Sequence, residues 1–544
     1  MTSNVLAAIP SEPSAAARRF DKPAHPLARV LFFALVVAGF VYAGASVVWD
    51  TQQVGEQLAG GVFLFLALAL LIALGFEFVN GFHDTANAVA TVIYTNAMPA
   101  HFAVVWSGFF NFLGVMLSSG AVAYSIVTLL PVDLILNVGS GAGFAMIFAL
   151  LLAAVAWNLA TWYVGLPNSS SHTLIGSVLG VGLANQLINS GTSGTAGVDW
   201  SQATKVLTGL WMAPLIGFTA AALLLLVLRY VVRNPRLMTA PEGDAPPPTG
   251  IRALLIFTCT AVSFSHGSND GQKGMGLIML ILIGCAPTAY ALNRTLPASD
   301  TPAFVASAQA SAQVLRQQGA APMAIDNARP VLKSALERRA LVSPNAYGAI
   351  IAVSQDLSQR VQGYGALSRV PASAAENIRN DMYLVLESIR MVGKSPAAGL
   401  SDPEKAALGD YQSRLEKGTR YIPLWVKVAV ALALGLGTMI GWKRIVVTVG
   451  EKIGKQHMTY GMGASAELVA AATILAADRF GLPVSTTHIL SSGVAGASVA
   501  SGHGLQRRTL IQLAAAWLLT LPVAMLLSGL LYWALLVVVR GGGF

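Results

Sequence analysis

Long apolar runs alternate with short polar links along most of this chain. A membrane-spanning helix needs about 20 consecutive, mainly apolar residues. The pattern predicts such spans at residues 30–48, 62–79, 102–130, 144–164, 207–232, 256–285, 422–442, 462–477 and 510–539. Two shorter apolar stretches, 175–188 and 489–499, are typical of the broken or re-entrant helices of transporters. We therefore predict an all-α polytopic membrane protein with about 10–12 membrane segments.

The charged residues are few and unevenly distributed. Of the 544 residues, 11% are charged and 55% are hydrophobic, whereas soluble domains carry about a quarter charged residues. Residues 294–420 alone contain 15 Lys and Arg and 11 Asp and Glu. This composition excludes an ordinary soluble enzyme and favours a protein embedded in the lipid bilayer. We interpret residues 293–420 as a polar helical insertion in that membrane protein.

The basic residues predict how the chain is oriented in the membrane. Lys and Arg accumulate in cytoplasmic loops, and here they form clusters within 18–29, 229–236, 443–455 and 507–508. The links 50–61 and 131–143 contain neither residue type, so we expect them outside, together with the insertion. The basic residues in cytoplasmic loops then explain the net charge of +9. No nucleic-acid partner is expected.

These boundaries divide the chain into seven predicted regions. They are a cytoplasmic tail (1–28), a first transmembrane helix with its link (29–61), membrane repeat 1 (62–236), a cytoplasmic linker (237–252), the first part of membrane repeat 2 (253–292), the polar helical insertion (293–420) and the second part of repeat 2 (421–544).

Two motifs occur twice, in the same order. Gly81-Phe-His-Asp-Thr-Ala-Asn-Ala resembles Gly267-Ser-Asn-Asp-Gly-Gln-Lys-Gly, and Leu166-Pro-Asn-Ser-Ser-Ser-His resembles Leu482-Pro-Val-Ser-Thr-Thr-His. The basic clusters indicate that the two copies enter the membrane from opposite sides. We therefore predict two inverted-topology repeats whose broken helices meet at the midplane.

Asp84 and Asp270 occupy matched positions in apolar segments. Ionisable residues inside a membrane are costly and are usually functional. The neighbouring glycines are expected to let the backbone unwind, while Asn87 and Asn269 add neutral oxygens and N–H donors. Such carboxylates fit Na⁺ or a transferable proton. A structural ion pair is the alternative for either Asp alone.

The second motif predicts a helix N-terminus in each half, because a proline precedes three hydroxyl residues. Free N–H groups and the positive end of the helix dipole attract anions there. Two such ends approaching from opposite leaflets would suit a tetrahedral oxyanion, with plain N-capping as the alternative. The candidate anion-binding hydroxyls are Ser169, Ser170, Ser171, Ser485, Thr486 and Thr487.

An anion next to two carboxylates requires a compensating positive charge, because like charges repel strongly at low dielectric. A co-bound cation or a proton would supply it, which predicts symport. Lys273 stands where the first half has Asn87, and His83 stands where the second half has Asn269. Both differences shift the expectation from Na⁺ toward H⁺. The alternative for Lys273 is a side chain that snorkels to the membrane surface.

Further titratable residues are weaker candidates. His172 and His488 end the hydroxyl motifs, and His266 lies just before Asp270; a packing role is the simpler interpretation of each histidine. Glu467 lies in an apolar segment without a first-half counterpart and is a second-tier coupling candidate. No resident metal or cofactor is expected.

With these motifs, the chain resembles the inorganic phosphate transporter (PiT) family, in particular its bacterial low-affinity phosphate permeases. Residues 81–93 and 265–284 carry the resemblance, although His83 and Lys273 depart from the usual G-x-N-D-x-x-N-A motif. It implies phosphate uptake across the bacterial inner (plasma) membrane, coupled to protons and often as a neutral divalent metal–phosphate complex. It also implies that phosphate is held between the Asp motifs and the hydroxyl triplets. It does not explain the insertion 293–420.

The leading hypothesis is secondary active uptake of inorganic phosphate with protons or divalent cations. Transport of sulfate or another tetrahedral oxyanion and Na⁺-coupled phosphate symport are alternatives. An intramembrane hydrolase is disfavoured, because a histidine next to its serine in a helix does not face it. A passive channel and a phosphate sensor also stay open, as does a homo-oligomer.

Overall fold

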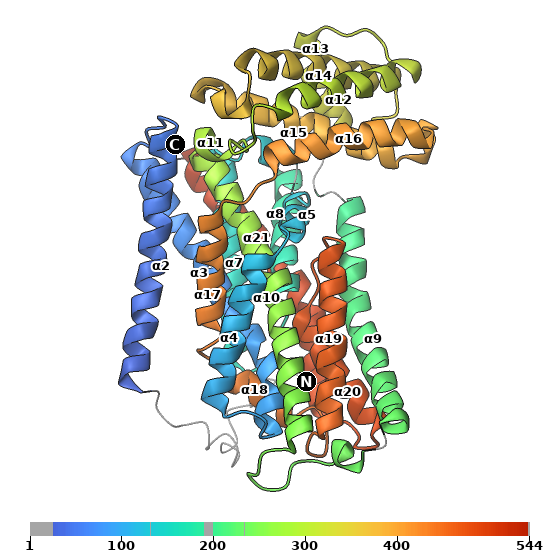
Figure 1. Cartoon of the computed structure of the whole chain (residues 1–544). Helices are drawn as coiled ribbons and strands as arrows, with labels where there is room; N and C mark the ends of the chain where they lie inside the picture. Colours follow the sequence, from blue (N-terminus) through green and yellow to red (C-terminus); the bar gives the residue numbers. More distant parts are fainter. Residues whose placement is uncertain (1–24, 131, 190–197, 199, 233, 542–544) are drawn as a thin grey trace.

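The structure is a computed structural model that describes residues 25–130, 132–189, 198, 200–232 and 234–541, without the side chains of 85–87, 132–133, 189 and 201–202. A tall bundle of helices carries a separate helical module on one end (Figure 1). Apart from one isolated β-bridge between Gly454 and Leu505, the regular structure of the described residues is helical. Most of the expected tail 1–28 and one residue of the basic cluster 229–236 lie outside the described residues.

The bundle combines elements from both ends of the chain. Its elements before the module are α2 (Pro26–Gln53), α3 (Gly60–Tyr94), α4 (Ala100–Leu117), α5 (Ala121–Val127), α6 (Val132–Leu136), α7 (Gly141–Tyr163), α8 (Ser170–Asn189), α9 (Trp200–Val231), η1 (Pro235–Met238), α10 (Thr249–Cys285) and α11 (Pro287–Tyr290). Those after it are α17 (Leu424–Gly437), α18 (Lys443–Glu451), α19 (Tyr460–Arg479), α20 (Thr486–Ala500) and α21 (Arg507–Gly541).

Among the described residues, 7 helices are long and apolar enough to cross a membrane, or up to 8 if one bent pair counts as a span. The bent pair joins α17 to α16, which lies in the module (Figure 1). The expected count of membrane segments also includes α8, α10, α17 and α20, which lie within the bundle but are too short or not apolar enough to be counted among these helices. The prediction of an all-α, multi-pass membrane protein is confirmed.

Several expected spans end elsewhere. The predicted span 102–130 is wrong: α4 ends at Leu117, and Gly120 adopts φ 86° before the short helix α5. Glycine has no Cβ to clash in that left-handed region, so the chain can turn there. The span 422–442 is also shorter than predicted, since α17 ends at Gly437 and the amphipathic α18 follows.

The expected unwinding beside Asp84 and Asp270 is also wrong, because α3 and α10 continue as helices through both motifs. The motif glycines instead bring helices close together. A Cβ on Gly81 would lie 2.2 Å from the carbonyl oxygen of Leu434 in α17, and one on Gly267 would lie 2.1 Å from that of Asn111 in α4. Small residues allow such close backbone approach between membrane helices.

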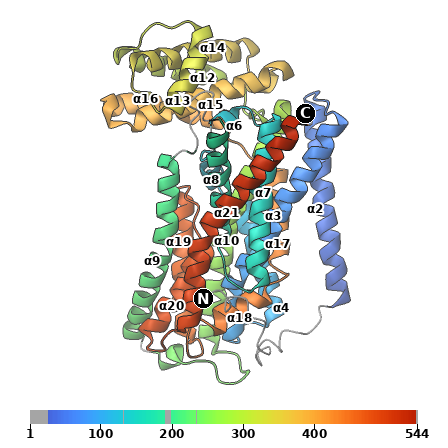
Figure 2. The ribbon, with the colours of Figure 1, turned by 180° about the vertical axis from the view of Figure 1, so that it is seen from behind.

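The matched helices of the two halves run in opposite directions. Glu56, just before α3, accepts a hydrogen bond from the backbone N–H of Thr288, just after α10 (3.1 Å). At the other end, Asn96 follows α3 and donates to the carbonyl of Gly243, before α10 (2.9 Å). Helices α8 and α20 extend toward opposite ends of the bundle (Figures 1 and 2). An inverted repeat requires this arrangement, although descent from one duplicated unit stays a prediction.

The basic loops gather at the end of the bundle opposite the module. Gln506 donates its backbone N–H to Ile453 (2.9 Å), and Tyr460 donates to Thr239 (3.3 Å), so the loops around 453, 506 and 239 lie together. The links without Lys or Arg lie at the module end: Asp50 accepts from the hydroxyl of Tyr290 (2.9 Å). This separation fits the expected orientation, whose assignment to the two membrane sides stays a prediction.

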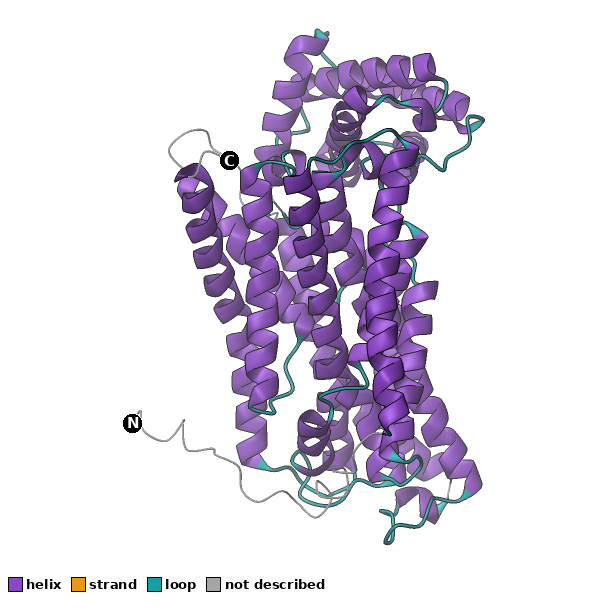
Figure 3. Cartoon of the chain, turned by 90° about the vertical axis from the view of Figure 1, so that its left-hand side faces the viewer, coloured by secondary structure: helices purple, strands orange, loops and turns teal. Residues whose placement is uncertain are grey.

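The insertion forms a helical module at one end of the bundle (Figure 3). This module has its own hydrophobic core. Its elements are α12 (Asp300–Gln317), α13 (Ile325–Glu337), α14 (Pro344–Tyr364), η2 (Leu367–Arg369), α15 (Ala372–Lys394), η3 (Pro396–Ala398) and α16 (Asp402–Thr419). Arg329 forms ion pairs with Asp381 (2.8 Å) and Asp356 (2.6 Å) across three of these helices. Hydrogen bonding to Asp381 raises the pKa of Arg329 above its ordinary value.

Candidate functional site

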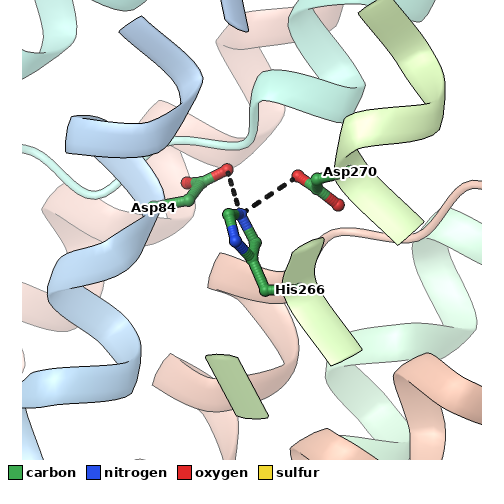
Figure 4. Close-up of side chains that lie close together, drawn as sticks. All are labelled: Asp84, His266 and Asp270. Carbon is green, nitrogen blue, oxygen red and sulfur yellow. Dashed lines mark ion pairs between the residues drawn. The ribbon is translucent and has the colours of Figure 1, made fainter. Parts of the chain in front are cut away.

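The Asp motifs of both halves meet in the centre of the bundle, although their residues are far apart in sequence (Figure 4). His266 lies between the two carboxylates: its Nε2 is 3.9 Å from Asp84 Oδ2 and 3.5 Å from Asp270 Oδ2. Its Nδ1 lies 2.8 Å from Asn111 Oδ1. On the other side of Asp84, His83 Nδ1 lies 3.4 Å from Oδ1. All of these side chains are buried.

Lys273 brings an ammonium group into this cluster. Its Nζ lies 2.7 Å from Asp270 Oδ1 and donates to Ser171 Oγ at 2.5 Å. The residue is 1% exposed, so its ammonium does not reach the membrane surface. The snorkelling alternative is therefore wrong. Lys273 instead joins the Asp motif of the second half to the hydroxyl triplet of the first.

The first hydroxyl of each triplet caps its helix. Ser169 Oγ accepts from the backbone N–H of His172, and Ser485 Oγ accepts from that of His488, both at 3.1 Å. A Ser side chain commonly satisfies one of the free N–H groups at a helix start in this way. The expected N-capping is thus present in both halves, but it occupies one hydroxyl of each three.

The third hydroxyls connect the triplets to the rest of the site. Ser171 Oγ donates to the carbonyl of Val484 at 2.6 Å, which brings the starts of α8 and α20 together. Thr487 Oγ1 donates to Asp84 Oδ1. Each triplet therefore reaches the Asp motif of the opposite half, Ser171 through Lys273 and Thr487 directly.

The middle hydroxyls, Ser170 and Thr486, are buried and find no hydrogen-bond partner among the described residues. Buried polar groups are normally hydrogen-bonded, so two matched exceptions require an explanation. Both lie in the first turn of a helix, where backbone N–H groups and the helix dipole favour an anion. Ser170 and Thr486 are therefore the hydroxyls available to bind an anion.

The two predicted asparagine ligands have different outcomes. Asn269 donates to the carbonyl of Leu482 (3.1 Å) and accepts from the N–H of Val484 (3.4 Å). Its amide thus holds the segment that leads into the second hydroxyl triplet, which makes it a positioning residue in this arrangement. The side chain of Asn87 lies outside the described residues.

His172 and His488 lie together at the starts of α8 and α20. Their ring centroids are 4.5 Å apart, and the His488 ring is 4.2 Å from that of Trp517. His172 Nδ1 lies 2.9 Å from Ser169 Oγ, whereas His488 Nε2 has no hydrogen-bond partner among the described residues. The two histidines are therefore packed next to the hydroxyl triplets.

Glu467 does not join the central cluster. It accepts from Thr258 Oγ1, and Thr258 precedes Asp270 by 12 residues in α10, a distance of about 18 Å along a helix. Sequence reasoning missed a second buried carboxylate, Glu77, which lies two helical turns before Asp84 in α3. The same signal that singled out Glu467, an acidic residue in an apolar run, would have found it.

The donor set of the cluster also suits a divalent cation. Asp84, His266 and Asp270 offer one nitrogen and two carboxylate oxygens that lie within 4.8 Å of one another. Imidazole and carboxylate are common ligands of first-row divalent metals. The site thus combines a cation-binding triad with two helix starts suited to an anion.

Residues 80–528 match the model of the family described as the phosphate transporter family. The chain belongs to this family. Its similarity to curated relatives extends over nearly their whole length. It is 44% identical to the low-affinity inorganic phosphate transporter PitA of Escherichia coli K12 and 42% identical to PitB of the same organism, over 88% of this chain and 98% of each relative. A solved structure, the sodium-dependent phosphate transporter, shares 19% identity and a TM-score of 0.48 over 87% of this chain and 100% of its own.

Membership of the phosphate transporter family confirms the resemblance predicted from the duplicated motifs. It also excludes the intramembrane hydrolase, because the family and its curated relatives are named as transporters. The family match runs from just before the first Asp motif to within α21 and includes both hydroxyl triplets. The central cluster therefore lies within the part of the chain that matches the phosphate transporter family.

Proposed function

We propose that this member of the phosphate transporter family takes up inorganic phosphate by symport with protons. The observation that carries the proposal is the meeting of two helix starts, each with one unpartnered hydroxyl, next to Lys273 and two carboxylates. The helix starts supply N–H donors, and Ser170 and Thr486 supply hydroxyls. The relatives named as low-affinity inorganic phosphate transporters support the same substrate.

The mixture of donors and acceptors favours phosphate over sulfate. Inorganic phosphate keeps at least one proton near neutral pH and can donate a hydrogen bond, whereas sulfate is fully deprotonated and can only accept. The site offers donors at the helix starts and at Lys273. It also offers carboxylate oxygens of Asp84 and Asp270 that could accept from a phosphate hydroxyl. A sulfate ion would face these oxygens without a proton between them, which is repulsive at low dielectric.

The charges of the cluster support proton coupling. Asp84 and Asp270 contribute two negative charges, and Lys273 and a protonated His266 contribute two positive ones. Entry of phosphate adds at least one negative charge, and burying an unpaired charge is costly. A proton that enters with phosphate removes this excess. Na⁺ coupling is disfavoured at Asp270, because the Lys273 ammonium already lies 2.7 Å from Oδ1.

A specific observation supports a second form of the substrate, the neutral complex of phosphate with a divalent cation. Asp84, His266 and Asp270 form the candidate cation-binding triad, and the hydroxyl triplets lie next to it through Thr487 and Ser171. In this form the metal is cargo held by the triad, while its phosphate ligand contacts the helix starts. The cation then replaces the proton as the compensating charge.

Uptake of radiolabelled phosphate into proteoliposomes tests the proposal. An imposed pH gradient, acidic on the side of entry, should drive accumulation, and a Na⁺ gradient of the same size should not. Removing divalent cations with a chelator separates the two forms of the substrate. Excess sulfate should compete poorly. Accumulation that ignores both the pH gradient and divalent cations would reject symport, and equal competition by sulfate would reject the substrate assignment.

A further inference from the structure

Glu77 is a buried carboxylate that the proposed transport cycle has not yet used. It is 0% exposed, its Oε2 accepts from Asn80 Nδ2 at 3.3 Å, and its Oε1 has no hydrogen-bond partner among the described residues. It lies seven residues before Asp84 in α3, about 10 Å along the helix toward the module end. An ionised carboxylate with so little compensation inside a membrane is costly and suggests a function.

Helix α10 leaves room for this carboxylate at one residue. A Cβ on Gly274 would lie 2.3 Å from Glu77 Cγ and 2.4 Å from Oε1. The Glu77 side chain therefore packs directly against the backbone of α10 at Gly274, the residue after Lys273. Lys273 directly precedes Gly274 and carries its ammonium on a flexible four-carbon stem, which can change partners.

The charged surroundings of Glu77 come from α10. Lys273 and Asp270 are the charged groups that act on it electrostatically. Of the other helices packed against α3, α7 contains no Asp, Glu, Lys, Arg or His, and Lys427 of α17 donates to the carbonyl of Ser118 at 2.9 Å. The remaining ones, α4, α8, α18, α19 and α20, carry His101, His172, Lys443, Arg444, Glu451, Glu467, Asp478, Arg479 and His488. The Lys273 ammonium thus acts on two carboxylates among the described residues, Asp270 and Glu77. In the structure it is paired with Asp270.

We propose that Glu77 is a proton-binding coupling residue, and that Lys273 moves between Asp270 and Glu77 as the proton on Glu77 is lost and regained. The inference rests on the proposed proton-coupled phosphate uptake and names a residue that links the two ligands. With the proton on Glu77 Oε1, Lys273 stays with Asp270 and Ser171, as in the structure. When Glu77 loses its proton to water, its ionised carboxylate attracts the Lys273 ammonium. The ammonium then leaves Ser171.

This exchange couples the proton to the anion. Ser171 adjoins Ser170 at the start of α8, so the position of Lys273 decides whether the anion site carries a positive charge. A protonated Glu77 keeps that charge in place and favours phosphate binding. An ionised Glu77 withdraws it and favours release. Because coupling between two binding sites is reciprocal, bound phosphate in turn favours the protonated form of Glu77.

The test compares Glu77→Gln with the unmodified protein. Glutamine keeps the shape and stays neutral, so Lys273 should remain at the anion site at every pH. Phosphate affinity is measured by calorimetry on the detergent-purified proteins at about pH 6 and about pH 8. The titration of phosphate itself is the same for both proteins. At each pH we divide the dissociation constant of the unmodified protein by that of Glu77→Gln. We expect this ratio to be about ten-fold larger at the higher pH than at the lower one. Glu242→Gln, an exposed acid-to-amide change in the linker, is the matched control.

Transport assays complete the test. In proteoliposomes, Glu77→Gln should still exchange internal for external phosphate but should lose accumulation driven by a pH gradient. If the unmodified protein shows no proton-driven uptake, the proposed function itself fails. If it does, and Glu77→Gln shows the same uptake and the same pH dependence of binding, the Glu77 inference alone is overturned. Loss of exchange as well as accumulation would also overturn the inference. Glu77 would then be needed for folding or for phosphate binding, and not only to carry the proton.

Discussion

The two half-sites use the same parts but carry different charges. Asp84 is surrounded by groups that are neutral or titratable, namely His83, His266 and the hydroxyl of Thr487. Asp270 instead contacts the ammonium of Lys273 at 2.7 Å. In the structure Asp270 is thus paired with an ammonium, while the compensation of Asp84 depends on protons or a cation. The half-site of Asp84 is therefore the one without a lysine partner.

The hydroxyl triplets, in contrast, are alike in both halves. The first hydroxyl caps its helix, the third contacts the opposite Asp motif, and the middle one has no partner among the described residues. Symmetry is therefore kept where an oxyanion would be held and broken where its charge would be balanced. A single tetrahedral anion between two helix starts gains from matched donors, whereas charge balance needs a defined number of protons.

The largest expected effect comes from removing the charge of either carboxylate. Asp84→Asn and Asp270→Asn should each abolish phosphate accumulation, by roughly 100-fold or more, because each loses a charge that must be balanced during transport. Uptake into proteoliposomes measures the effect, with Asp50→Asn at the module end of α2 as a control. Near-normal uptake by either variant would remove that carboxylate from the coupling mechanism.

The same two variants should differ in stability. Asp270→Asn leaves the buried Lys273 ammonium without its carboxylate, which costs about 3–5 kcal/mol. Asp84→Asn leaves His266 with Asp270 as its partner (3.5 Å) and should cost only about 1–2 kcal/mol. Thermal unfolding in detergent compares the two, and Asp270→Asn combined with Lys273→Met should recover most of the loss. Equal destabilisation by the two single variants would contradict the difference in charge between the half-sites.

The duplicated motifs located the central residues from sequence because polar side chains stand out in apolar segments. The role of their glycines could not be predicted, since a glycine permits both unwinding and close helix packing. Whether Lys273 snorkels or stays buried likewise depends on the helices around it. The position of His266 between both carboxylates required the fold, although its spacing of four residues from Asp270 places both on one helix face. Glu77 was missed although, like Glu467, it is an acidic residue in an apolar run outside the repeated motifs.

The symmetric part of the comparison can be tested at the middle hydroxyls. Ser170→Ala and Thr486→Val should each weaken phosphate binding by roughly 10-fold, since a hydrogen bond to a charged group contributes about 1.5–3 kcal/mol. The two effects should be similar in size. Half-saturation of uptake is the measurement. Ser177→Ala is a matched control in α8, because Ser177 bonds to its own helix at Thr173. A large effect in one half alone would mean that the anion contacts a single helix start.

The smallest expected effect comes from making the charges of the two halves alike. Lys273→Asn restores the residue type that the first half has at Asn87 and removes the permanent charge beside Asp270. Asp270 is then free to bind a cation, so uptake should become several-fold more dependent on added Na⁺ or Mg²⁺ while its response to pH weakens. Uptake rates at increasing cation concentration measure this change, and Lys273→Arg, which keeps the charge, should not show it. If cation dependence stays the same in Lys273→Asn, the ammonium has a packing role, and the asymmetry between the half-sites does not determine the coupling ion.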